Sequence, residues 1–230
     1  MKLSPEDQAK QIELEDQYGD NLACFAIPGL GLVAVAAPEA PPTGQAHPFW
    51  KLYSGLKGDN PDRVQLMSAF ALECLVHPER RDVSAFLQRR PAAAVKLYRA
   101  ARDLCGDNVL VNPDPTEAEA EEIARLKREH GEITWCRVDG VGLMVIAAPE
   151  NPTCYRQFFN DCSNGLDATA PEDVITQFAL DCIVHPARDR VEGVFRRLPA
   201  LAVGVANRGT ELCGGDIEEL GKASRPPATT

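Results

Sequence analysis

Residues 70–78 read Phe-Ala-Leu-Glu-Cys-Leu-Val-His-Pro, and residues 178–186 read Phe-Ala-Leu-Asp-Cys-Ile-Val-His-Pro. The same offset of 108 residues relates further positions on the C-terminal side of both stretches. The residues that recur are Arg80, Val83, Arg89, Pro91, Leu104, Cys105 and Gly106, matched by Arg188, Val191, Arg197, Pro199, Leu212, Cys213 and Gly214. Because chance does not place so many matches in one register, the sequence predicts a tandem duplication.

The duplication sets the expected domains. A chain of 230 residues fits two units of about 100 residues each, which is an ordinary domain size. We expect a first repeat unit at residues 1–110 and a second at residues 111–216. The segment 217–230 ends in Ser-Arg-Pro-Pro-Ala-Thr-Thr, and we predict that it is a disordered tail.

Charge and hydropathy exclude several classes of partner. The net charge of −10 argues against nucleic acid and against an anionic membrane surface, because both need clustered Lys and Arg. No apolar run reaches the length of about 20 residues that a membrane span requires. The N-terminus leads directly into charged residues rather than into the apolar region of a signal peptide, so we expect a cytoplasmic location.

The order of local signals predicts an α+β fold. Ser4-Pro5 starts a helix that runs to about Tyr18, and two apolar runs at 22–27 and 32–37 flank a Gly-rich hairpin turn. A helix opened by aromatic residues follows. A central helix carries Val64 to Leu75 and ends at His77, since Pro78 disfavours a helical residue before it. A short helix and a final helix, from Pro91 to a cap at Gly106, complete the unit.

The second half repeats this order. Asp114-Pro115-Thr116-Glu117 is expected to cap its first helix, and strands at 133–138 and 141–148 flank Asp139-Gly140, a hairpin signal. The central helix is expected to include Ile183. The predicted architecture is a tandem repeat of two similar, mainly helical units, each with an N-terminal helix, a β-hairpin and three to four further helices.

Two Cys-x-x-His pairs, Cys74 with His77 and Cys182 with His185, are the sharpest candidates for chemistry. Together they could supply four ligands to one structural zinc ion. Each Cys, however, lies on the apolar face of its predicted helix, where a free thiol packs as a small hydrophobic group. A catalytic Cys needs an exposed, electropositive setting, which that face does not offer. We therefore predict no catalytic, cofactor-binding or metal-binding residues, and eight free thiols.

Charged residues have ordinary structural explanations. Several acidic residues lie near predicted helix N-termini, where capping and the helix dipole explain them: Asp59, Asp62, Asp167, Glu172 and Asp173. Arginines flank the short third helix of both halves, where a solvated face is the simpler interpretation and an acidic partner segment is the alternative. These arginines are Arg80, Arg81, Arg89, Arg90, Arg188, Arg190, Arg196 and Arg197.

Aromatic residues open a helix just after the hairpin in both halves. They are Phe49, Trp50 and Tyr53 in the first half and Tyr155, Phe158 and Phe159 in the second. Core packing is one explanation for them. Binding of a partner helix is the other, since aromatic residues are the usual anchors in such grooves. These six residues are the predicted partner-binding set.

The second half carries a resemblance to a known family. Its motifs, in order, are Pro115-Thr116-Glu117, His130-Gly131, Ala148-Pro149, Pro152-Thr153-x-Tyr155-Arg156-x-Phe158, Cys182-Ile183-Val184-His185-Pro186, Arg197-Leu198-Pro199 and Leu212-Cys213-Gly214. This order resembles the small tail assembly chaperones of tailed bacteriophages, over nearly all of each unit. The first half departs from it, with Pro48-Phe49-Trp50 in place of the Pro-Thr-x-x-Tyr segment. Ala148 stands where the family has Arg, and the family usually has one unit per chain.

The resemblance implies a non-enzymatic role without a cofactor. Such chaperones bind the helical tape measure protein and assist assembly of tail-tube subunits on it, so both proteins are the implied partners, in the cytoplasm of the bacterial host. Two tandem sites would gain effective concentration over one. A structural component of a phage tail or phage-like particle is the first alternative, and a Cys/His metal-binding protein is the second.

Overall fold

The computed structural model describes residues 3–40, 42, 45–57, 61–107, 112–163 and 171–215. The chain divides into two compact units, Met1–Asp107 and Asn108–Thr230. The predicted boundary between residues 110 and 111 and the predicted tail at 217–230 lie outside the described residues. Within the described part, no helix combines the length and the apolar character that crossing a membrane requires.

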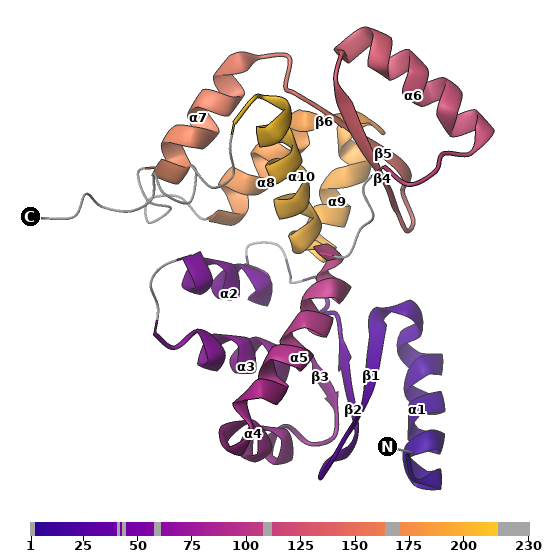
Figure 1. Ribbon diagram of the computed structural model, residues 1–230, viewed down its shortest axis with the longest axis vertical. Coiled ribbons are helices and arrows are strands. Elements are labelled where there is room, and N and C mark those ends of the chain that lie inside the picture. Colours follow the sequence, from indigo (N-terminus) through magenta and orange to yellow (C-terminus); the bar gives the residue numbers. More distant parts are fainter. Residues whose placement is uncertain are drawn as a thin grey trace, which may run out of the picture. The chain divides into compact units, whose positions relative to one another are not determined.

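The first unit is a small sheet with helices on both sides (Figure 1). Its elements are α1 (Pro5–Tyr18), β1 (Leu22–Ile27), β2 (Gly31–Ala36), α2 (Pro48–Lys57), α3 (Arg63–Glu73), β3 (Leu75–His77), α4 (Arg80–Arg89) and α5 (Pro91–Arg102). Gly106, with φ of 97°, ends the helical turn that follows α5, as the sequence predicts for a left-handed cap.

The second unit has its elements in the same order. They are α6 (Glu117–His130), β4 (Ile133–Val138), β5 (Gly142–Ala147), α7 (Pro152–Ser163), α8 (Pro171–Cys182), β6 (Ile183–His185), α9 (Arg188–Arg197) and α10 (Pro199–Leu212). The predicted α+β class and both predicted hairpins are confirmed. That the two units arose by duplication stays a prediction.

The predicted end of each central helix is wrong. In the first unit α3 ends at Glu73, and Leu75–His77 forms a third strand antiparallel to β2, with Val35 opposite Leu75 and Ala34 opposite His77. In the second unit β6 pairs with β5 in the same way. Pairing with a distant strand replaces the last helical turn, and helical spacing within a segment contains no information about that partner. The bonds His77–Pro78 and His185–Pro186 are both cis.

The middle strand of each sheet is buried on both faces. Leu32 and Ala34 of β2 pack with Leu14 of α1, whereas Val33 and Val35 point to the opposite face, where α5 packs. In the second unit, β5 packs against α6 on one face and α10 on the other. A strand covered on both faces reads as a continuous apolar run, which is why 32–37 and 141–148 show no alternation.

The first helix of each unit is capped by side chains, with one correction. Ser4 Oγ accepts the N–H of Asp7 at 3.1 Å, as the sequence predicts. In the second unit Thr116, not Asp114, is the cap, and Glu119 rather than Glu117 completes the capping box. A second correction concerns Val64, which the periodicity places on the apolar face of α3 but which is 42% exposed.

Candidate functional site

The first unit buries most of its predicted binding aromatics. Phe49 is 3% exposed and Trp50 4%, whereas Tyr53 is half-buried. The Phe49 ring meets Trp50 edge-on at 5.4 Å and Phe70 of α3 at 6.3 Å. These rings therefore attach α2 to α3, and a partner that docks on the intact unit reaches Tyr53 rather than Phe49 or Trp50.

The second unit arranges its aromatics differently. Phe158 of α7 is 7% exposed, whereas Tyr155 and Phe159 are half-buried. The Phe158 ring stacks on Phe178 of α8, with centroids 4.2 Å apart and planes within 8°. Tyr155 also contacts Phe178, at 6.0 Å. The stacked pair joins α7 to α8 and leaves a hollow beside it.

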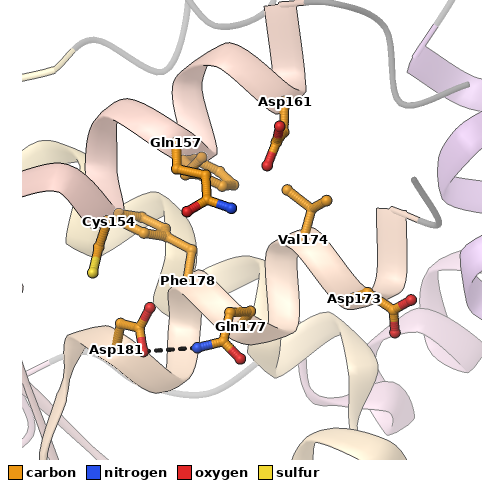
Figure 2. A pocket seen from close by; sticks show the side chains of 9 residues that line it. Cys154, Gln157, Asp161, Asp173, Val174, Gln177, Phe178 and Asp181 are labelled. Atoms are coloured by element: carbon orange, nitrogen blue, oxygen red, sulfur yellow. Dashed lines mark hydrogen bonds between the residues drawn. The ribbon is translucent and has the colours of Figure 1, made fainter. Parts of the chain in front are cut away.

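A pocket of about 460 Å³ lies between α7 and α8 (Figure 2). Phe158, Val174 and Phe178 form its apolar floor. The polar residues at its walls and rim are Cys154, Gln157, Asp161, Asp173, Gln177 and Asp181. Figure 2 shows Gln157 and Asp161 of α7 pointing toward Val174 of α8, whereas Gln177 turns toward Asp181 and Asp173 turns away from Asp161. Its size is typical of sites that receive a ligand or partner side chains.

Local contacts fix the two helices that form this pocket. Asn151 Oδ1 accepts the N–H of Thr153 at 3.0 Å, with Pro152 at the first helical position of α7. At the other end, α8 approaches α10 so closely that a Cβ on Gly209 would collide with the Cys182 sulfur. Contacts outside the pocket therefore fix the positions of both helices that form its walls.

The pocket is acidic, but its three carboxylates differ. Arg188 of α9 donates to Asp181 Oδ1 at 3.0 Å and to the side-chain Oε1 of Gln177 at 2.9 Å, and the side-chain Nε2 of Gln177 donates to Asp181 Oδ1 at 2.9 Å. Asp161 and Asp173 make no hydrogen bond or ion pair with the described residues. The charge of Asp181 is thus neutralised, whereas Asp161 and Asp173 keep their negative charges with no cation beside them among the described residues.

The Cys-x-x-His pairs do not converge within either unit. Cys182 packs against Gly209 of α10, whereas His185 Nδ1 lies 3.5 Å from Glu122 of α6. Among the described residues, no three His, Cys, Asp or Glu side chains gather as a metal site requires. Burial raises the pKa of both the Cys74 and the Cys182 thiol, which opposes formation of the thiolate that a metal or a nucleophilic mechanism needs.

Cys154, the one thiol in the pocket wall, is not activated either. Partial burial and then the neighbouring Asp181 carboxylate raise the pKa of the Cys154 thiol. None of the eight cysteines, all of which lie in the described part of the chain, forms a disulfide. The pocket therefore offers aromatic contacts and carboxylates rather than a nucleophile.

The arginines around α4 and α9 mostly have partners within their own unit. Arg80 pairs with Glu73 at 2.9 Å, in the same way that Arg188 pairs with Asp181. Arg196 pairs with Glu192, and Arg90 lies over the Phe86 ring at 5.5 Å. These contacts favour the solvated, structural interpretation over an acidic partner segment.

Sequence reasoning missed the polar residues of the pocket. It identified Phe158 and explained Asp173 by its place near a helix N-terminus, but it gave no role to Gln157, Asp161 or Gln177. The sequence does contain a signal for this side of the pocket. Cys154, Phe158 and Asp161 are spaced four and three residues apart and so share one face of α7.

Comparisons of the chain with protein-family models, with curated proteins and with solved structures give no match.

Proposed function

We propose that this chain is a non-enzymatic tail assembly chaperone of a bacteriophage, which binds the helical tape measure protein and assists assembly of the tail tube in the bacterial cytoplasm. The observation that carries the proposal is the pocket between α7 and α8, with its floor of Phe158, Val174 and Phe178. A groove between two helices with an apolar floor and polar walls suits the apolar face of a partner helix.

The chemistry of the described residues supports a binding role. The raised pKa of the Cys74, Cys154 and Cys182 thiols disfavours covalent catalysis. A rod of amphipathic helix has to be shielded until tube subunits enclose it, and the net charge of −10 keeps such a carrier soluble. The motif order of the second unit supports the choice of the tail assembly chaperone family.

We also propose that the two units are products of one duplication. The equal order of elements, the equal sheet topology and the matching pairs Arg80–Glu73 and Arg188–Asp181 support this. The resulting chain would offer two related surfaces to one long partner, which raises the effective concentration of the second contact.

Co-expression with the tape measure protein of the same phage genome tests the function. We expect the tape measure protein to become soluble and to co-purify with the chain. Gln157→Trp, which fills the pocket from an exposed position of α7, should reduce recovery of the complex. Gln88→Trp, at an exposed position of α4, is the matched control and should leave recovery unchanged. No complex and no gain in solubility would exclude the proposal.

A structural component of the tail is the second candidate, and it shares the same partners. Mass spectrometry of purified particles separates the two candidates. A chaperone is absent from the mature particle, whereas a structural component is present at a fixed number of copies.

A further inference from the structure

The three carboxylates that line the α7–α8 pocket differ in their partners. Asp181, whose side chain is 21% exposed, is paired with Arg188. Asp161 is half-buried and Asp173 is exposed, and neither has an ion-pair partner among the described residues. The pocket lining therefore has an excess of two negative charges.

This excess constrains what can dock there. A partner that covers the pocket removes water from Asp161, and an unpaired carboxylate that loses its water is costly. A cationic head group on the partner offsets that cost, because charge-assisted hydrogen bonds to carboxylates are stronger than hydrogen bonds between neutral groups. A partner carboxylate at the same place adds repulsion instead, so the pocket discriminates by charge.

The floor beside these carboxylates suits the stem of the same side chain. Phe158 and Val174 are apolar and line the same pocket as Asp161 and Asp173. Lys and Arg bury their methylene stems on apolar surface while the head group stays at the polar rim. An aromatic ring in the floor adds a favourable contact for the cation.

We propose that the pocket receives a Lys or Arg side chain from an amphipathic helical segment of the partner, with its head paired to Asp161 and its stem on Phe158 and Val174. This inference rests on the proposed function, since it takes the partner to be a helix. Asp161 is then the residue that determines specificity, and Asp173 adds negative charge to the same pocket lining. Asp181 does not contribute, because it is already paired with Arg188.

The test uses the full chain and three 18-residue helical peptides as probes. The peptides share one leucine stripe and carry Lys, Gln or Glu beside it. Binding is followed by NMR titration of backbone amides at low salt. We expect the Lys peptide to shift the amides around Gln157, Asp161 and Gln177, and the Glu peptide to cause no shift there. The affinity for the Lys peptide should fall with added salt, because exposed charges are screened.

Two charge-neutralising variants make the test residue-specific. Asp161→Asn should weaken binding of the Lys peptide by about fivefold or more, and addition of Asp173→Asn should weaken it further. Asp139→Asn removes the same charge from the exposed β4–β5 turn and leaves an Asn-Gly hairpin turn, so it should not change affinity. Equal binding of the Lys and Glu peptides, equal effects of Asp161→Asn and Asp139→Asn, or absence of shifts at α7 and α8 would each overturn the proposal.

Other occupants of the pocket give distinct outcomes. If Asp161→Asn changes the sedimentation of the peptide-free chain, a second copy occupies the pocket and the proposal is wrong. It is also wrong if the Lys peptide binds only after removal of residues 216–230. If the Lys peptide binds as expected but the tape measure protein does not, the inferred charge selection stands and the proposed function fails. If the tape measure protein binds but Asp161→Asn does not change the affinity for the Lys peptide, the proposed function stands and the inferred charge selection fails.

Discussion

The ring of Phe158 on α7 lies parallel to the ring of Phe178 on α8, with centroids 4.2 Å apart and planes within 8°. The pair has two roles, because it joins the helices and forms the pocket floor. In the first unit the α2–α3 contact between Phe49 and Phe70 is edge-on, at 6.3 Å and 73°. Loss of binding after a change in Phe178 would therefore not separate docking from folding, and the exposed residues of the pocket are the better probes.

The stacked pair makes a measurable contribution to stability. We expect Phe158→Ala to lower the free energy of unfolding by about 3–5 kcal/mol, since it removes a buried aromatic side chain. A double-mutant cycle with Phe178→Leu should show a coupling of about 0.5–1.5 kcal/mol in urea denaturation, the range typical of aromatic pairs. Additive effects of the two changes would show that stacking itself contributes nothing.

His47 gives the first unit a dependence on pH. His47 is 1% exposed, and its Nδ1 accepts the N–H of Phe49 at 3.1 Å, which caps α2. Its Nε2 has no hydrogen-bond partner among the described residues. Burial lowers the pKa of the His47 imidazole, and the nearby Pro38 carbonyl offsets part of that effect. Protonation would place a hydrogen on the capping nitrogen.

Because the folded-state pKa lies below the unfolded value of 6.5, the unfolded chain binds the proton more tightly. The cap's contribution is fully present above pH 6.5 and is lost as the pH falls through the folded pKa. His47→Asn reproduces the cap that Asn151 forms in the second unit and does not titrate. We expect the slope of unfolding free energy against pH below 6.5 to be smaller in this variant. An unchanged slope would show that unfolding does not lead His47 to take up a proton.

Removal of the Arg188 charge from the Arg188–Asp181 pair should make the pocket more negative. Arg188→Gln leaves Asp181 without its cation, so we expect the Lys peptide to bind about twofold to fivefold more tightly. The pair is partly exposed, so the cost in stability should stay below about 1 kcal/mol. Arg80→Gln breaks the corresponding pair with Glu73 in the first unit and is the control. Weaker binding in Arg188→Gln would contradict the charge argument.

Local signals in the sequence predict much of the fold. The cap at Ser4 and the helix starts at Pro91 and Pro199 depend on neighbouring residues, and the structure has them where expected. The hairpin at Asp139-Gly140 also forms, but its turn is one residue longer than expected, because β5 begins at Gly142 rather than at Val141. The third strand of each sheet was missed because its partner lies about 40 residues away in the chain, and helical periodicity reports only local neighbours.

The candidate site was only partly predictable for the same reason. Phe158 was visible as an aromatic that opens a helix. The pocket exists because α8 brings Val174 and Phe178 beside Gln157, Phe158 and Asp161 of α7, and no local pattern in the sequence specifies that packing. Pairing of Asp181 with Arg188 depends in addition on where α9 begins, after the β6 strand.

The most direct measurement of the central claim is site-specific photo-crosslinking in the co-expressed complex. A diazirine amino acid of about the size of Gln replaces Gln157 in the pocket wall, so that the pocket stays open, or, as the control, replaces Gln88 on α4. We predict a covalent adduct with the tape measure protein from position 157 and none from position 88. A complex that forms without an adduct at 157, or that gives equal adducts from both positions, would contradict the assignment of the α7–α8 pocket as the binding site.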